Sequence, residues 1–185
     1  MEDVSIQTLI ILFLILIVVS GFFSISETSM MALNKYKLRH LAKNKHRGAQ
    51  KTLNLLGQTD RLLGSILLGN NLSNTAAAAL VTAITFKLLG QSELSLTIAT
   101  LIVTVVLLIF SEITPKIIGA SFPEKIAFPA SYILEPLMRL MYPFVTVANS
   151  IVKVILWVLR IKPISGNQAS QLSQEELRTL VLEGG

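Results

Sequence analysis

The chain contains no cysteine, which excludes disulfide bonds and every metal site that depends on a thiolate ligand. Charge is also scarce. Only 15% of the 185 residues are Asp, Glu, Lys or Arg, whereas soluble domains carry about a quarter. In their place, 52% of the residues are hydrophobic. This composition argues against a soluble domain and predicts an integral membrane protein.

Three long stretches contain no charged residue at all: Val4–Ser26, Leu62–Phe86 and Leu94–Ser111. A helix needs about 20 apolar residues to cross roughly 30 Å of hydrocarbon. The first stretch could be a cleavable signal peptide, but it is long and follows acidic rather than basic residues. We therefore expect an all-α membrane protein with three transmembrane helices, at about residues 4–33, 62–86 and 94–118.

Basic residues gather between the first two spans. Eight of the sixteen Lys and Arg residues lie there: Lys35, Lys37, Arg39, Lys43, Lys45, Arg47, Lys51 and Arg61. Only Asp60 opposes them, which is typical of a cytoplasmic loop. This topology explains the net charge of +5 without nucleic acid as a partner. We expect a multi-pass protein of the plasma or inner membrane, with its N-terminus outside and its C-terminus in the cytoplasm.

The region 122–162 is apolar but contains four prolines: Pro123, Pro129, Pro136 and Pro143. Proline removes a backbone donor and clashes with the preceding turn of a helix. We therefore expect a juxtamembrane or re-entrant helical hairpin here, with a fourth span over Tyr142–Trp157 as the alternative.

The domain prediction follows from a change of composition after the apolar region. Residues 1–162 are expected to form the transmembrane domain. Residues 163–185 begin with a polar linker, after which Ser173 and Glu176 have the spacing of a helix capping box. We expect this last segment to be the start of a truncated cytosolic helical region.

The first two predicted spans are rich in polar side chains. Ser20 and Ser24 lie four residues apart and so share one helix face. The second span holds Asn70, Asn71 and Asn74, whose amides lipid cannot satisfy. Small residues at every fourth position resemble a helix-packing ridge, within the chain or across a dimer: Ser65, Gly69, Ser73 and Ala77. Helix packing alone and cation binding are both compatible with this pattern.

Glu112 is the acid of the third span, and Pro115 follows three residues later. Because proline cannot donate to the carbonyl of Ser111, a free backbone oxygen is expected beside the carboxylate. An ion pair between Glu112 and Lys116 at a helix end is the simpler alternative.

The polar groups of the three spans are expected at a similar depth. At 1.5 Å per residue, Ser24, Asn70 and Glu112 lie roughly 15, 13 and 6–10 Å from the basic ends of their spans. They can therefore converge in the inner half of the membrane. Hydroxyl, amide, carboxylate and carbonyl oxygens suit a hard cation such as Mg²⁺, Ca²⁺ or Na⁺. A single carboxylate predicts binding that is weak enough for release.

Three motifs occur in this order: SGFFSISETS at 20–29, LLGNNLSNTAAAA at 67–79 and FSEITPKIIG at 110–119. Together they resemble the transmembrane DUF21 domain of the CorC/CNNM family of magnesium transporters, over nearly the whole chain. The resemblance implies a homodimer in the lipid bilayer that exports Mg²⁺, driven by Na⁺ entry. It also implies a cytosolic CBS-domain pair that binds nucleotide, which we expect in the full-length protein and not within these 185 residues.

The resemblance further implies which residues form the ion site: Ser20, Ser24, Asn70, Asn71 and Glu112. Gly69 and Pro115 would shape the backbone around it. We therefore expect a Mg²⁺ transporter that works by alternating access, and not an enzyme. A Mg²⁺-binding sensor without transport is the alternative. An intramembrane hydrolase with Ser24 as nucleophile would need an activating base, and both histidines lie outside the predicted spans.

Overall fold

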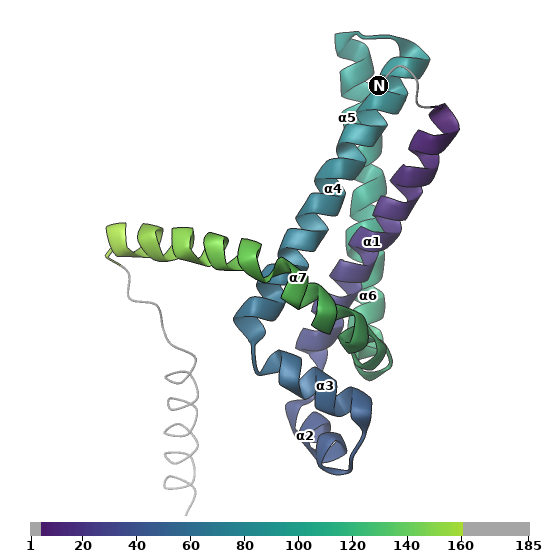
Figure 1. Cartoon of the computed structure of the whole chain (residues 1–185). Coiled ribbons are helices and arrows are strands. Elements are labelled where there is room, and N and C mark those ends of the chain that lie inside the picture. The colour runs from purple at the N-terminus through teal and green to yellow at the C-terminus, as the bar shows by residue number, and fades with distance from the viewer. Residues whose placement is uncertain (1–4, 161–185) are drawn as a thin grey trace, which may run out of the picture. The chain divides into compact units, whose positions relative to one another are not determined.

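The structure is a computed structural model that describes residues 5–160, and these residues form helices joined by short turns (Figure 1). The predicted linker and helix start at 163–185 lie outside the described residues. The chain divides into two compact units, Met1–Val145 and Thr146–Gly185, and the arrangement described below is that of the first. The elements in order are α1 (Ile6–Ala32), α2 (Lys35–Lys43), α3 (Arg47–Leu56), α4 (Thr59–Leu89), α5 (Glu93–Val106), a π-helix η1 (Leu107–Ile113), α6 (Thr114–Ser121) and α7 (Pro123–Val158).

The three predicted spans are confirmed as long apolar helices. They are α1, α4 and the continuous rod Glu93–Ser121 that α5, η1 and α6 form together. In Figure 1 these helices run side by side, with α1 packed against α4, η1 and α6. Gly119 permits the closest approach of α6 to α1, since an added Cβ would lie 2.8 Å from the Ile25 carbonyl oxygen. The described part of the chain is therefore an all-helical membrane domain.

The helix ends follow from local chemistry. The Asn34 side chain accepts hydrogen bonds from the backbone N–H groups of Tyr36 and Lys37 and so begins α2. His46 begins α3 in the same way, because its Nδ1 accepts from the Ala49 N–H at 3.1 Å. Gly90, with φ of 79°, ends α4 in a conformation that favours glycine. The histidine thus has a structural role on α3.

The region after α6 differs from the predicted hairpin. No turn interrupts it, and α7 is one continuous helix, Pro123–Val158. Its three internal prolines follow one another at intervals of seven residues, at Pro129, Pro136 and Pro143, and all three are exposed. Residues seven apart lie on the same side of a helix, so the missing backbone N–H donors fall along one exposed stripe. The opposite stripe, which includes Ala127 and Leu134, is buried. The hairpin prediction was wrong because it treated each proline as a break. By length and composition α7 is a fourth candidate span.

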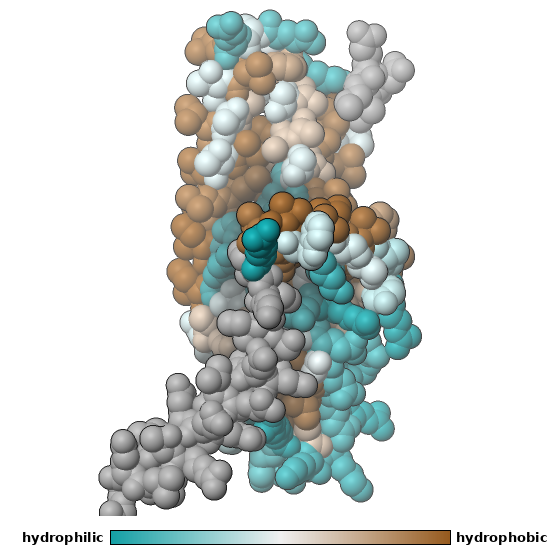
Figure 2. All heavy atoms as spheres, turned by 90° about the vertical axis from the view of Figure 1, so that its left-hand side faces the viewer, coloured by the Kyte–Doolittle hydropathy of each residue, from teal (hydrophilic) through white to brown (hydrophobic). Residues whose placement is uncertain are grey.

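A hydrophobic core joins the basic ends of α1 and α4 to α2, α3 and α7. Its largest fully buried side chains include Met30, Leu38, Leu62 and Leu134. Exposed apolar side chains are numerous along the long helices, and Figure 2 shows them as a band with hydrophilic side chains at both ends. This surface is the one expected of helices that face lipid.

Candidate functional site

The small-residue ridge of α4 packs against α1 of the same chain. Ser65, Gly69, Ser73 and Ala77 are all buried. The ring of Phe23 lies directly over Gly69, where an added Cβ would come within 2.6 Å of both Cε atoms. The packing interpretation of this ridge is therefore confirmed. It also sets the register that places Asn70, the next residue along α4, against α1.

Three oxygens meet where α1 crosses α4. The Ser20 Oγ lies 2.6 Å from Oδ1 of Asn70 and 2.6 Å from Oδ1 of Asn74. A serine hydroxyl has one proton, so it can donate to only one of these oxygens at a time. Ser20 is fully buried and Asn70 nearly so. The three oxygens therefore have more lone pairs than the one hydroxyl proton can satisfy, in a place that the neighbouring helices enclose.

Glu112 joins this cluster from the third span. The Asn70 Nδ2 donates to its Oε1 at 3.0 Å. Because only the amide nitrogen can donate to a carboxylate, this contact turns the Asn70 amide oxygen toward Ser20. The other carboxylate oxygen, Oε2, pairs with Lys116 at 2.8 Å. The ion pair between Glu112 and Lys116, which was the simpler alternative, is thus present together with the contact between Glu112 and Asn70.

The backbone beside Glu112 is a π-helix, which the sequence did not predict. The Thr114 N–H donates to the carbonyl of Ile109, five residues earlier. In this register Pro115 would pair with Phe110, so the oxygen that the proline leaves without a donor belongs to Phe110 rather than Ser111. The Phe110 oxygen faces α1, 3.4 Å from where a Cβ on Gly21 would lie. Short π-helical segments are frequent at functional sites.

Ser24 and Asn71 behave differently from the other predicted site residues. Ser24 lies one turn from Ser20 and is fully buried, and its Oγ has no hydrogen-bond partner among the described residues. Asn71 is exposed on another face of α4 and takes no part in the cluster. Asn74 was missing from the predicted site, although its spacing of four residues from Asn70 was a sufficient signal.

The arrangement is suited to a hard cation. Ser20, Asn70 and Asn74 contribute neutral oxygens, and Glu112 contributes the single negative charge. No group of three His, Cys, Asp or Glu side chains that could hold a metal occurs in residues 5–160. Weakly charged oxygen sites favour alkali and alkaline-earth ions over transition metals.

Comparison with known proteins identifies the family. A model of the cyclin M transmembrane N-terminal domain, CNNM, matches residues 10–185. The chain belongs to the cyclin M family. The UPF0053 inner membrane protein YfjD of Escherichia coli is 45% identical to this cyclin M domain over 89% of the chain. A UPF0053 protein of Haemophilus influenzae is 40% identical over all of it. A chloroplastic DUF21 domain-containing protein of Arabidopsis thaliana is 31% identical over 92%.

These relatives confirm the resemblance to the CorC/CNNM family and show that the chain is a multi-pass membrane protein. The cyclin M domain covers only 38% of the E. coli protein and 43% of the H. influenzae protein. The activity and partners of a whole protein of this kind are therefore matters for proposal.

Proposed function

We propose that this cyclin M domain moves Mg²⁺ across the membrane through the cluster at Ser20, Asn70, Asn74 and Glu112. The observation that supports it best is the surplus of oxygen acceptors around the Ser20 hydroxyl, held in place by the carboxylate of Glu112. In the proposed site Glu112 supplies the charge and the two amides supply neutral oxygens. Ser20 and Ser24 form the wall on α1.

The chemistry of the cluster favours Mg²⁺ that keeps part of its water shell. Mg²⁺ dehydrates reluctantly and is usually held by one or two carboxylates together with waters. Here one carboxylate is available, and the Lys116 ammonium already pairs with it. An incoming cation has to compete with this ammonium. The proposed site is therefore weak and releases its ion readily, as a carrier requires.

The direction of transport, the coupling ion and the oligomeric state are proposed from what the family resemblance implies. We propose export coupled to Na⁺ entry by alternating access, in a homodimer of the plasma or inner membrane with its N-terminus outside. The exposed amide of Asn71 supports a partner surface, because an amide facing hydrocarbon lacks hydrogen-bond partners. Asn71 therefore remains a candidate for contact with the second copy. The whole protein is proposed to be a transporter and not an enzyme.

The deciding experiment is Glu112→Gln, which keeps the size of the side chain and removes its charge. Mg²⁺ flux into liposomes is measured with an internal fluorescent indicator, with and without a Na⁺ gradient. Even partners outside the first coordination shell contribute about 10- to 100-fold to metal affinity, so the loss of the only carboxylate should abolish saturable flux. Glu93→Gln, an exposed acid at the start of α5, is the matched control.

A Mg²⁺-binding sensor is the alternative function. Isothermal titration would then detect Mg²⁺ binding that Glu112→Gln removes, while wild-type liposomes show no flux above empty ones. Wild-type flux in the Glu112→Gln protein, together with unchanged binding, would contradict both functions at this cluster.

A further inference from the structure

A second polar site lies at the basic end of the bundle, away from the Ser20 cluster. A cavity of about 440 Å³ opens between α3, the first turn of α4 and α7. It belongs entirely to the first compact unit. The polar side chains that matter for its chemistry are Lys51, Gln58, Arg61, Glu135, Arg139 and Tyr142. The volume is sufficient for a small charged group with some water.

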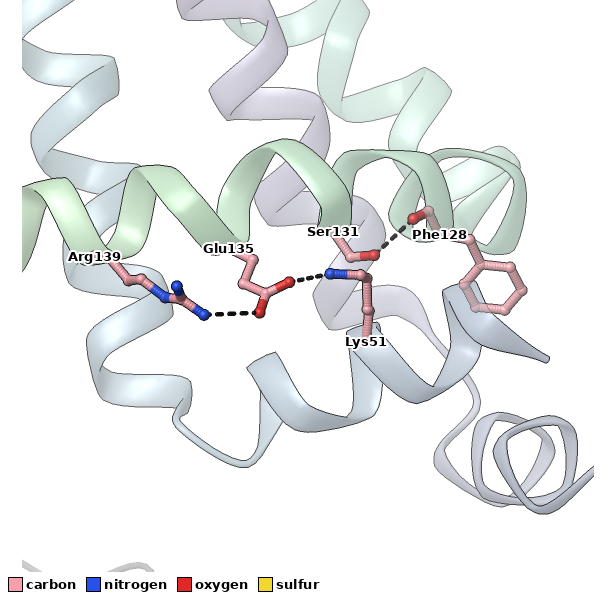
Figure 3. Close-up of polar contacts among 5 residues, drawn as sticks. All are labelled: Lys51, Phe128, Ser131, Glu135 and Arg139. Atoms are coloured by element: carbon pink, nitrogen blue, oxygen red, sulfur yellow. Dashed lines mark hydrogen bonds and ion pairs between the residues drawn. The ribbon is translucent and has the colours of Figure 1, made fainter. Parts of the chain in front are cut away.

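The cavity carries a surplus of positive charge. Figure 3 shows Lys51, on α3, and Arg139, on α7, both directed at the carboxylate of Glu135. One acid is therefore shared between two cations. Arg61 pairs with no carboxylate in the part of the chain that the structure describes. Its guanidinium instead donates to Gln58 at 3.1 Å and lies 4.8 Å from the ring centre of Tyr142. Three cations against one acid leave this cavity attractive to an anion.

The cavity lies at the edge of the apolar part of α4. Arg61 immediately precedes Leu62, the first residue of the uncharged stretch that continues to Phe86. At such a boundary the headgroups of a bilayer meet its hydrocarbon. Leu55 and Met138 form an apolar part of the cavity wall. The polar, positive cavity thus also offers apolar contacts.

We propose that this cavity binds the phosphate group of an anionic phospholipid. The planar guanidinium groups of Arg61 and Arg139 can each donate two hydrogen bonds to phosphate oxygens. Glu135 holds Lys51 and Arg139 in place, and Leu55 and Met138 offer apolar contacts to the part of a lipid beyond its phosphate. A free phosphate has the same charge chemistry but makes no use of these contacts. Phosphatidylglycerol is therefore expected to bind better than phosphate alone.

The test measures lipids that remain bound to the purified protein. Native mass spectrometry in detergent follows added phosphatidylglycerol, phosphatidylcholine and inorganic phosphate, each alone. Wild type should retain phosphatidylglycerol preferentially. Arg61→Gln and Arg139→Gln should each weaken retention about fivefold, from about 1 kcal/mol for a basic residue at an anionic surface. Arg61→Lys should recover part of the loss. Arg47→Gln, an exposed arginine of α3 outside the cavity, is the control and should bind like wild type.

Each other outcome overturns the proposal. Equal retention of phosphatidylglycerol in all variants would show that the cavity binds no lipid. Equal retention of phosphatidylcholine and phosphatidylglycerol by the wild type would refute the requirement for a net anionic lipid. Retention of inorganic phosphate without retention of phosphatidylglycerol would show that the cavity binds free phosphate and not the phosphate group of a lipid. Circular dichroism of every variant shows that the helices are intact, so that lost binding is not lost folding.

Discussion

Replacing Gly69 by alanine tests whether the close contact of α1 and α4 holds the side chains of Ser20, Asn70 and Glu112 together. The new Cβ would lie within 2.6 Å of the Cε atoms of Phe23, a ring that is only 4% exposed and packs edge-on against Phe22. Because the ring is nearly buried, we expect either that the helices separate or that the ring leaves its rotamer. Overpacking of this kind costs about 1–3 kcal/mol. Since Asn70 follows Gly69 directly, we also expect its contact with Ser20 to weaken.

The assay has two readouts and two comparison variants. Unfolding in mixed detergent and SDS micelles, followed by circular dichroism, gives the change in free energy, and titration gives the Mg²⁺ affinity. Gly21→Ala is the matched control on the facing helix, because its Cβ would meet its nearest neighbours at 3.4 and 3.5 Å, an ordinary contact. Phe23→Leu in the Gly69→Ala background should recover part of both losses. Equal stability of Gly69→Ala and wild type, or a larger loss in Gly21→Ala, would refute the reasoning.

Two further predictions concern individual ligands and their competitor. Asn74→Ala should weaken Mg²⁺ binding in titrations about tenfold, on the scale of groups that orient a metal site, whereas Asn71→Ala should leave the affinity unchanged. A loss of affinity in Asn71→Ala but not in Asn74→Ala would restore Asn71 to the site in place of Asn74. Lys116→Met should tighten Mg²⁺ binding about two- to fivefold, because a partly exposed ion pair contributes about 0.5–1 kcal/mol. The same variant should release Mg²⁺ more slowly in stopped-flow measurements. Weaker binding would show that Lys116 organises the site instead of competing with the cation for Glu112.

The main features of the site could be predicted from the sequence because depth along a helix is a simple count. Uncharged windows located the three spans, and the distance of Ser24, Asn70 and Glu112 from the basic ends placed them at a similar level. The structure brings Ser20, one turn from Ser24, together with Asn70 and Glu112. The choice between Asn71 and Asn74 needed direction around the helix as well as depth. Neighbouring residues on a helix point about 100° apart, so Asn70 and Asn71 could not both face Ser20.

The backbone at two other places could not be predicted from residue types alone. The π-helix at Leu107–Ile113 depends on a hydrogen-bond register one residue longer than usual, and an apolar run such as LLIF carries no sign of it. On α7, the prolines at seven-residue spacing were expected to end the helix. They leave it continuous because the stripe they interrupt is exposed while tertiary contacts hold the other side, as at Leu134.

The ion pair between Lys116 and Glu112 has a consequence for the return step of a carrier. A carboxylate alone in a low-dielectric environment is costly, so an empty binding site would resist the change from one side of the membrane to the other. Because Lys116 lies one helical turn away on the same rod, its ammonium is available as soon as a cation departs. In the proposed transport cycle the unloaded protein would therefore carry its own counter-ion, and the return step would require no bare charge inside the membrane.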